Sequence, residues 1–183
     1  LKFKILPPFL ALHFILLLII TSVTGPSLKA QNFVFSRTVS GQEIIFSANQ
    51  DFSVITQLTA DISCWDPCVS PDGQYVAYIK GKKGSAMALW VMNINGIYQK
   101  RLTYDTINYG SHPSWHPNGK QILYESATTT DKYESEIRIV NAVGTNDAVL
   151  LDNAGDKDRF PCINPADTNK VVYHYDPGNW PYF

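Results

Sequence analysis

Short apolar runs separated by turn residues follow one another from about residue 33 onward. Two of the clearest runs, 75–78 and 122–124, are rich in the β-branched and aromatic residues that favour strands. Asp72-Gly73 and Asn118-Gly119 come just before these runs, and Gly and Asn tolerate the positive φ that tight hairpins require. The pattern predicts an all-β chain of short antiparallel strands.

The same order of features returns along the chain. Pro67, Pro113 and Pro161 open three similar segments and lie 46 and 48 residues apart. Each unit reads as strand, turn, strand, loop, strand, Gly turn and strand. Four short antiparallel strands in about 45 residues are typical of one propeller blade, which buries both of its faces only against neighbouring blades.

The details of the repeat resemble a known family. Pro113-Ser114-Trp115 is followed by a Pro-Asn-Gly turn, and the preceding unit contains Leu89-Trp90-Val91-Met92-Asn93, Gly96 and Arg101-Leu102-Thr103. This pattern resembles the WD40-like (PD40) repeat of TolB-type β-propellers. Residues 67–103 match it most fully, 113–151 match it with His116 where Ser is usual, and 161–175 match it in part. The resemblance implies that the Pro-x-Trp strand is innermost and the Arg-Leu-Thr strand outermost.

On this basis, residues 31–183 are predicted to form part of a TolB-like β-propeller. The expected blades span about 33–59, 66–103, 112–151 and 160–183, and the first begins at its second strand. We expect the sequence to be the N-terminal fragment of a ring of about six or seven blades. The α/β domain that precedes the propeller in TolB does not match any segment here, so roles that depend on that domain are not expected.

The first 30 residues have the order of regions found in a signal peptide. Lys2 and Lys4 precede an apolar run over 9–20, which is interrupted only by His13 and followed by a more polar stretch ending at Ala30. The run is shorter than the roughly 20 residues of a membrane-spanning helix. We therefore expect residues 1–30 to direct export to the periplasm or outside the cell, with no stable membrane span after cleavage. An uncleaved membrane anchor is the alternative.

Charge and cysteine content narrow the function classes. The net charge of −1, from 15 basic and 16 acidic residues, gives no reason to expect a nucleic-acid partner. Cys68 and Cys162 occupy the same place two repeats apart, too far for an easy disulfide. Cys64 and Cys68 could form a local bridge in an oxidising compartment. Otherwise Cys68 and Cys162 are expected to be small packing residues of inner strands.

The sequence predicts no catalytic residue, no cofactor and no metal site. His112 and His116 would lie about 13 Å apart on a strand and are expected in a loop or at the rim of the channel rather than on a zinc ion. Ser70 lacks the Gly-x-Ser-x-Gly setting of a hydrolase nucleophile. The other candidates are expected to be turn or core residues: Asp72, Asp105, Trp90 and Trp115.

Loops are the expected contact surfaces, since loops carry binding while blades supply rigidity. The candidates lie in 80–85, in 127–135 and in the charged stretch 152–159. The residues selected in the first two are Lys80, Lys82, Lys83, Asp131, Lys132 and Tyr133. Ordinary solvated hairpin tips are the alternative interpretation of all three.

Three functions are compatible with these features. The first is an exported, non-catalytic binding or scaffold module for a protein or glycan partner, contacted through blade loops or the channel mouth. The second is the N-terminal propeller of a longer secreted enzyme, such as a serine peptidase whose propeller gates an α/β-hydrolase domain. The third, ranked lowest, is a lyase or hydrolase with a metal in the channel, because propellers support many functions and no ligand cluster is visible.

Overall fold

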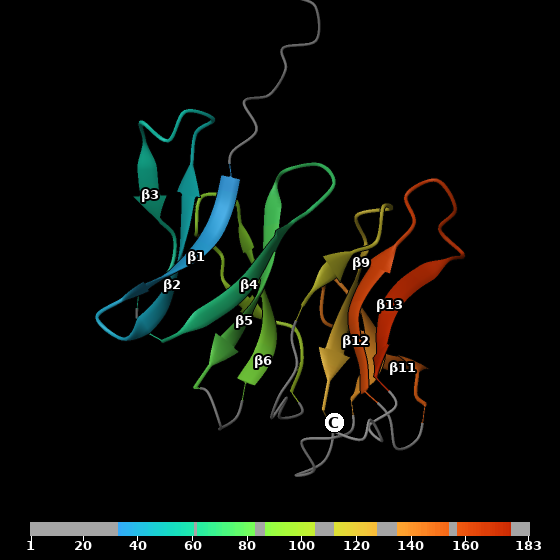
Figure 1. The fold of residues 1–183 in the computed structure, drawn as a ribbon. Coiled ribbons are helices and arrows are strands. Elements are labelled where there is room, and N and C mark those ends of the chain that lie inside the picture. The colour runs from blue at the N-terminus through green and yellow to red at the C-terminus, as the bar shows by residue number, and fades with distance from the viewer. Residues whose placement is uncertain are drawn as a thin grey trace, which may run out of the picture.

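The computed structural model describes residues 33–60, 62–82, 87–104, 112–127, 135–153 and 157–176. All regular elements in these ranges are β-strands (Figure 1). A search of the same residues finds no helix with the length and apolar character needed to cross a membrane.

The strands form four antiparallel sheets in which neighbours in sequence are neighbours in space. The first sheet contains β1 (Phe33–Val39), β2 (Gln42–Ala48) and β3 (Ile55–Gln57). The second contains β4 (Cys64–Val69), β5 (Tyr75–Gly81), β6 (Met87–Asn93) and β7 (Lys100–Arg101). The third contains β8 (Ser114–Trp115), β9 (Gln121–Ser126), β10 (Glu136–Asn141) and β11 (Ala148–Leu151). The last contains β12 (Lys157–Ile163) and β13 (Val171–Asp176).

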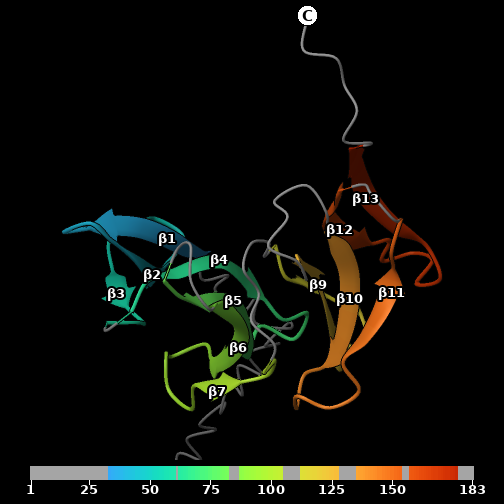
Figure 2. The same ribbon diagram turned by 90° about the horizontal axis from the view of Figure 1, so that it is seen from below.

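The sheets stand side by side in an open arc, as Figure 2 shows. β4, β8 and β12 are the first strands of their sheets, and β8 contacts both of the others at the inner side of the arc. The prediction of an all-β propeller built from four-stranded antiparallel blades is confirmed, and the ring is not closed.

The predicted hairpin turns form as expected. Gly73 has a φ of +72° and its N–H donates to Ser70 O over 2.8 Å. The Asp72 carboxylate accepts hydrogen bonds from the Ser70 hydroxyl (2.6 Å) and Gln74 N (3.0 Å). Asp72 is therefore a turn residue, as the sequence predicted, whereas Asp105 lies outside the described residues.

Both faces of a blade are buried, which explains the continuous apolar run at its centre. On β5, Val76 and Tyr78 pack against the first sheet, in a cluster with Ile45 and Leu58. The alternate residues Ala77 and Ile79 pack towards the third sheet. All four β5 side chains are at most 1% exposed. A strand that alternates between two apolar neighbours has no polar face.

Two tryptophans contribute to the apolar clusters between neighbouring sheets. Trp115 is buried between the second and third sheets, and its indole N–H donates to Cys68 O over 2.9 Å. Trp90 is partly buried against the other cluster. The prediction that both residues belong to the blade core is confirmed for Trp115 and holds in part for Trp90.

A Leu-Thr pair directly follows the outer strand of the first and of the second sheet, as Leu58-Thr59 after β3 and Leu102-Thr103 after β7. Leu102 N donates to Leu89 O over 2.9 Å, and Leu89 N donates to the Thr103 hydroxyl over 3.1 Å. Thr59 accepts a hydrogen bond from Ile45 N over 3.0 Å in the first sheet. The threonine hydroxyl therefore continues the ladder beyond the last backbone pair, and the adjacent leucine enters the core.

Changing Thr103 to valine is expected to lower the free energy of unfolding of the full chain by about 1–2 kcal/mol. The buried Leu89 N–H would then have no acceptor, and burial of an unpaired donor is costly. Chemical unfolding measures the change. Thr103→Ser keeps the hydroxyl and is the matched control, expected to lose less; equal losses for the two variants would show that the hydrogen bond is unimportant.

Two glycines bring successive blades into close contact. A Cβ on Gly96 would lie 2.8 Å from the backbone oxygen of Leu58, in the preceding blade. A Cβ on Gly144 would lie 3.2 Å from the corresponding oxygen of Leu102. Both have positive φ, +82° and +80°. The Gly that follows the third strand is therefore needed both for its turn and for the close packing of its blade on the one before.

Candidate binding surface on the inner strands

Three equivalent residues, within the inner strands β4 and β12 or just before the inner strand β8, have an unusual backbone. Asp66, His112 and Phe160 each precede a proline and have φ values of +48°, +48° and +54°. This left-handed conformation is unfavourable for residues with a Cβ, and a following proline disfavours helical conformations further. A register shift between Trp65 and Cys68, repeated between Arg159 and Cys162, places Asp66 and Phe160 in bulges.

The three residues contact one another across the blades. His112 N donates to Asp66 Oδ2 over 3.5 Å, and the same oxygen lies 4.0 Å from His112 Nε2. The rings of His112 and Phe160 have centroids 4.0 Å apart. The ring of His174 on β13 lies edge-on to that of Phe160, with centroids 6.2 Å apart. We call Asp66, His112 and Phe160 the inner row.

A buried carboxylate lies behind the inner row. Glu125 of β9 has a side chain only 7% exposed, and its Oε2 lies 3.1 Å from His112 Nδ1. Its Oε1 lies 3.7 Å from Arg159 Nε. A buried charge is costly unless it is paired, and Glu125 has a partner on each side. The hydrogen bond that His112 donates to the Glu125 carboxylate raises the pKa of His112. Burial opposes this rise and the Asp66 carboxylate adds to it.

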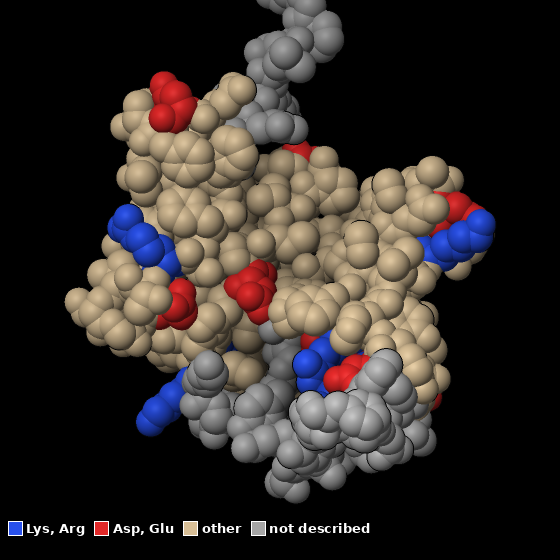
Figure 3. Space-filling view, in the orientation of Figure 1, with Lys and Arg blue, Asp and Glu red and all other residues tan. Residues whose placement is uncertain are grey.

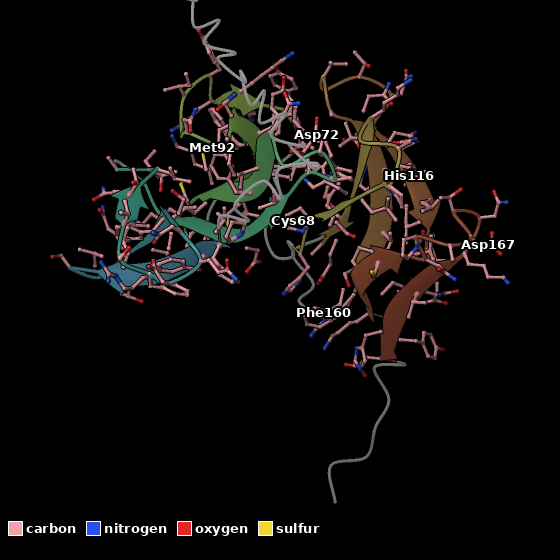
Figure 4. All side chains as sticks on the ribbon, turned by 90° about the horizontal axis from the view of Figure 1, so that it is seen from above. Cys68, Asp72, Met92, His116, Phe160 and Asp167 are labelled. Carbon is pink, nitrogen blue, oxygen red and sulfur yellow. The ribbon has the colours of Figure 1, made fainter. Side chains whose placement is uncertain are left out.

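Figure 4 shows Phe160, one residue of the inner row, on the concave side of the arc together with Cys68. Asp72, His116 and Asp167 belong to the turns that follow the inner strands. Phe160 is 50% exposed, and the side chains of Asp66 and His112 are 38% and 37% exposed. The row therefore leaves a carboxylate, an imidazole and an aromatic ring partly exposed.

The chemistry of these groups suits binding. No group of three or more His, Cys, Asp or Glu side chains within the described ranges could hold a metal ion. Burial raises the pKa of the Cys68 thiol, which keeps the sulfur protonated and a poor nucleophile. An aromatic ring beside hydrogen-bonding groups is a common combination at protein interfaces.

Only part of the predicted loop surface lies in the described residues. Lys80 belongs to β5, with its ammonium group 3.2 Å from Gln99 Oε1 and 5.0 Å from the centre of the Trp90 ring. The prediction that it lies in a flexible loop is wrong, because the hairpin continues to the pair Gly81–Met87. Lys82 follows the strand and is exposed. The remaining candidates lie outside the described residues: Lys83, Asp131, Lys132 and Tyr133.

The cysteine predictions need correction. Cys64, Cys68 and Cys162 all have free thiols. Cys64 and Cys68 lie four residues apart on β4, a separation of about 13 Å on a strand, so a local bridge cannot form there. Cys162 is exposed and is not a packing residue, whereas Cys68 is partly buried and packs against the cluster between the second and third sheets, as predicted. The buried Cys64 donates from its thiol to Ile62 O over 3.1 Å.

Two further candidates can be compared with their predictions. His116 lies where it was predicted, and Asp158 does not. His116 is in the turn after β8, where its Nδ1 accepts from Asn118 N over 3.1 Å, as predicted for a loop histidine. Asp158, from the predicted charged surface 152–159, is fully buried instead. Its carboxylate accepts a hydrogen bond from Asn153 N over 3.1 Å and so holds Asn153, which precedes β12, against that strand.

Charged side chains on the face in Figure 3 are scattered among uncharged residues rather than gathered by sign. This distribution agrees with the net charge of −1. A partner that binds mainly through opposite charge, such as a nucleic acid, would find no extended basic area on this face.

Sequence reasoning missed Glu125 and Phe160 as members of a site, whereas Arg159 lies in the predicted contact stretch 152–159. Glu125 lies in an apolar strand and carries no motif. The signal for Phe160 was present, however, because the residue before the repeated proline differs in every unit (Asp66, His112 and Phe160) while the proline does not.

The fold has clear counterparts among solved structures. A putative TolB from Agrobacterium tumefaciens superposes with a TM-score of 0.65 at 20% identity, over 80% of this chain and 55% of that one. TolB from Acinetobacter baumannii gives 0.64 at 15% identity, over 81% and 36% of the two chains. A structure from a study of two prolyl endopeptidases gives 0.60 at 18% identity, over 84% and 26%. The TolB-like β-propeller fold expected from the repeat is confirmed.

Sequence comparison gives one shorter match. Over 59 residues the chain is 42% identical to the uncharacterized peptidase YuxL of Bacillus subtilis (strain 168), covering 32% of this chain and 9% of that protein. No family model matches. The chain therefore spans only a small part of this relative and about half or less of the propeller-containing structures it matches.

Proposed function

We propose that this chain, with its TolB-like propeller fold, is a binding module that takes a polypeptide partner on the inner row. The observation that carries the proposal is the repeated strained backbone at Asp66, His112 and Phe160, which places three different, partly exposed side chains side by side. Strain of this kind clusters at functional sites, where the surrounding structure maintains it.

The chemistry of the row supports a polypeptide. An exposed aromatic ring is a typical anchor of a protein interface and can pack against an apolar side chain. The neighbouring carboxylate and imidazole can accept from and donate to peptide groups. The blades on either side are rigid, so the row is ordered before the partner arrives and binding costs less conformational entropy.

We place the module in the cell envelope or outside the cell. The order of positive, apolar and small polar residues over 1–30 supports export. Those residues lie outside the described part of the structure.

Site-specific photo-crosslinking of the full chain tests the proposal. A photoreactive phenylalanine analogue at Phe160 is expected to form adducts with a second polypeptide in the cells that make the protein. The same analogue at Tyr98, which is 83% exposed on the turn between β6 and β7, is the matched control. Adducts at Tyr98 but not at Phe160 would contradict the proposal, and adducts with carbohydrate would indicate a glycan partner instead.

A second candidate is the propeller of a longer peptidase. The 42% identity to a protein named as a peptidase, over 59 residues, favours it specifically. In that case the analogue at Phe160 is expected to crosslink to another domain of the same chain or to short peptides. The intact mass of the natural mature protein gives an independent answer, because a hydrolase domain would add about 200 residues beyond a closed ring.

A further inference from the structure

Four charged or titratable groups alternate in sign across three blades. Asp66 comes from β4 of the second sheet, and His112 precedes β8 of the third. Glu125 comes from β9 and Arg159 from β12 of the last sheet. His112 is the member that is charged only when protonated, and it contacts residues of both neighbouring blades.

We propose that His112 is a pH-sensitive latch that strengthens the contact between the second and third blades at the inner side of the arc when its imidazole is protonated. The contacts that carry the proposal are its approach to Asp66, its contact with buried Glu125 and its packing on Phe160.

The two ring nitrogens explain why protonation matters. A neutral imidazole has a single N–H, which can donate to Glu125 or to Asp66 but not to both. The imidazolium has two, so Nδ1 can donate to Glu125 at 3.1 Å while Nε2–H faces Asp66 at 4.0 Å. Protonation therefore adds an attraction between the second and third blades without loss of the contact within the third.

The surrounding groups favour the protonated form on balance. Asp66 on β4 and Glu125 on β9 face the imidazole with negative charge. Arg159 on β12 opposes it, but its guanidinium is itself paired with Glu125 at 3.7 Å. His174 on β13 also lies beside the Phe160 ring, with ring centroids 6.2 Å apart.

The direction of the pH effect follows from the raised pKa of His112. A histidine whose pKa is higher in the folded protein binds its proton more tightly there than in the unfolded chain. Its stabilisation is fully present below the unfolded value of 6.5 and is lost as the pH rises through the folded value. The latch is therefore closed in mildly acidic conditions and open in alkaline ones.

The latch also bears on binding. Asp66, His112 and Phe160 are the inner row itself, so loss of the proton changes the surface offered to a partner. This consequence for affinity rests on the proposed function, whereas the latch does not. An experiment without a partner therefore tests the latch alone.

Thermal unfolding of the full chain, followed from about pH 5 to about pH 9, tests the latch. The Tm is expected to fall by roughly 2–4 °C as the pH rises through the folded pKa of His112, the size expected for one ion pair in a protein of this length. His112→Gln and Glu125→Gln are both expected to remove this component. His116→Gln is the matched control, because His116 lies in the exposed turn of the same blade.

An unchanged pH dependence in His112→Gln would overturn the proposal. Should that variant fail to fold, the titration of His112 in the unaltered protein decides the question by NMR. The signal of His112, assigned by comparison with His13→Gln, His116→Gln and His174→Gln, is expected to titrate at a higher pH than that of an unperturbed histidine. A midpoint at or below the ordinary value would also overturn it.

Discussion

Replacement of Gly96 by alanine is expected to destabilise the full chain by about 2–4 kcal/mol. Two costs combine at this position. The φ of +82° is unfavourable for any residue with a Cβ, and the new Cβ would lie 2.8 Å from the Leu58 backbone oxygen. That oxygen belongs to the backbone of the outer edge of the first blade, so it cannot move aside without separating the blades.

Other glycines of the same chain separate the two costs. Gly73 has a similar φ of +72°, but nothing lies within 4 Å of its ideal Cβ. Gly73→Ala is therefore expected to cost only the conformational part, about 1–2 kcal/mol. Gly144→Ala, with a 3.2 Å approach to Leu102 O, should fall between them. Chemical unfolding gives the order, and an equal loss at Gly96 and Gly73 would mean that the contact between blades adds nothing.

Replacement of Leu102 by alanine is expected to cost about 2–5 kcal/mol. The side chain is 1% exposed and lies in the cluster between the second and third sheets, with Leu89, Trp115 and Ile122. Its removal takes apolar contacts from two blades at once. The surrounding strands are fixed by their ladders and can collapse into the space only in part, so a cavity remains.

Leu150→Ala is the matched control for this prediction. Leu150 lies on the outer strand β11 of the next sheet, but its side chain is 45% exposed. We expect a loss of no more than about 0.5 kcal/mol there. Urea or guanidinium unfolding of both variants measures the difference. A similar loss at the two leucines would contradict the view that burial between blades sets the cost.

Much of the fold could be predicted because the repeat carries its physical causes in adjacent residues. Asp72-Gly73 predicts a hairpin wherever it lies, and the structure has one there. The pair Leu102-Thr103 repeats because one residue fills the core and the other completes a hydrogen-bond ladder. These are local rules, so a single sequence is enough to apply them.

The candidate site could not be predicted in the same way, because its contacts are between blades. His112 meets Asp66 and Phe160, which lie 46 residues before it and 48 after it. The left-handed backbone that brings them together runs against the usual preference of a residue before proline. Lys80 shows a different kind of error. The basic stretch 80–85 predicts a loop, but its first residue still pairs with Ala88 in a hairpin.

The contacts of Gly96 and Gly144 have a direction that bears on how the protein is made. In both cases the later blade supplies the turn and the earlier blade supplies the finished outer strand on which the turn rests. Domains generally fold from the N-terminus first as the ribosome releases the chain. The outer strand of each blade is therefore synthesised before the turn that packs on it. We expect each new blade to fold against the preceding blade, which is already folded.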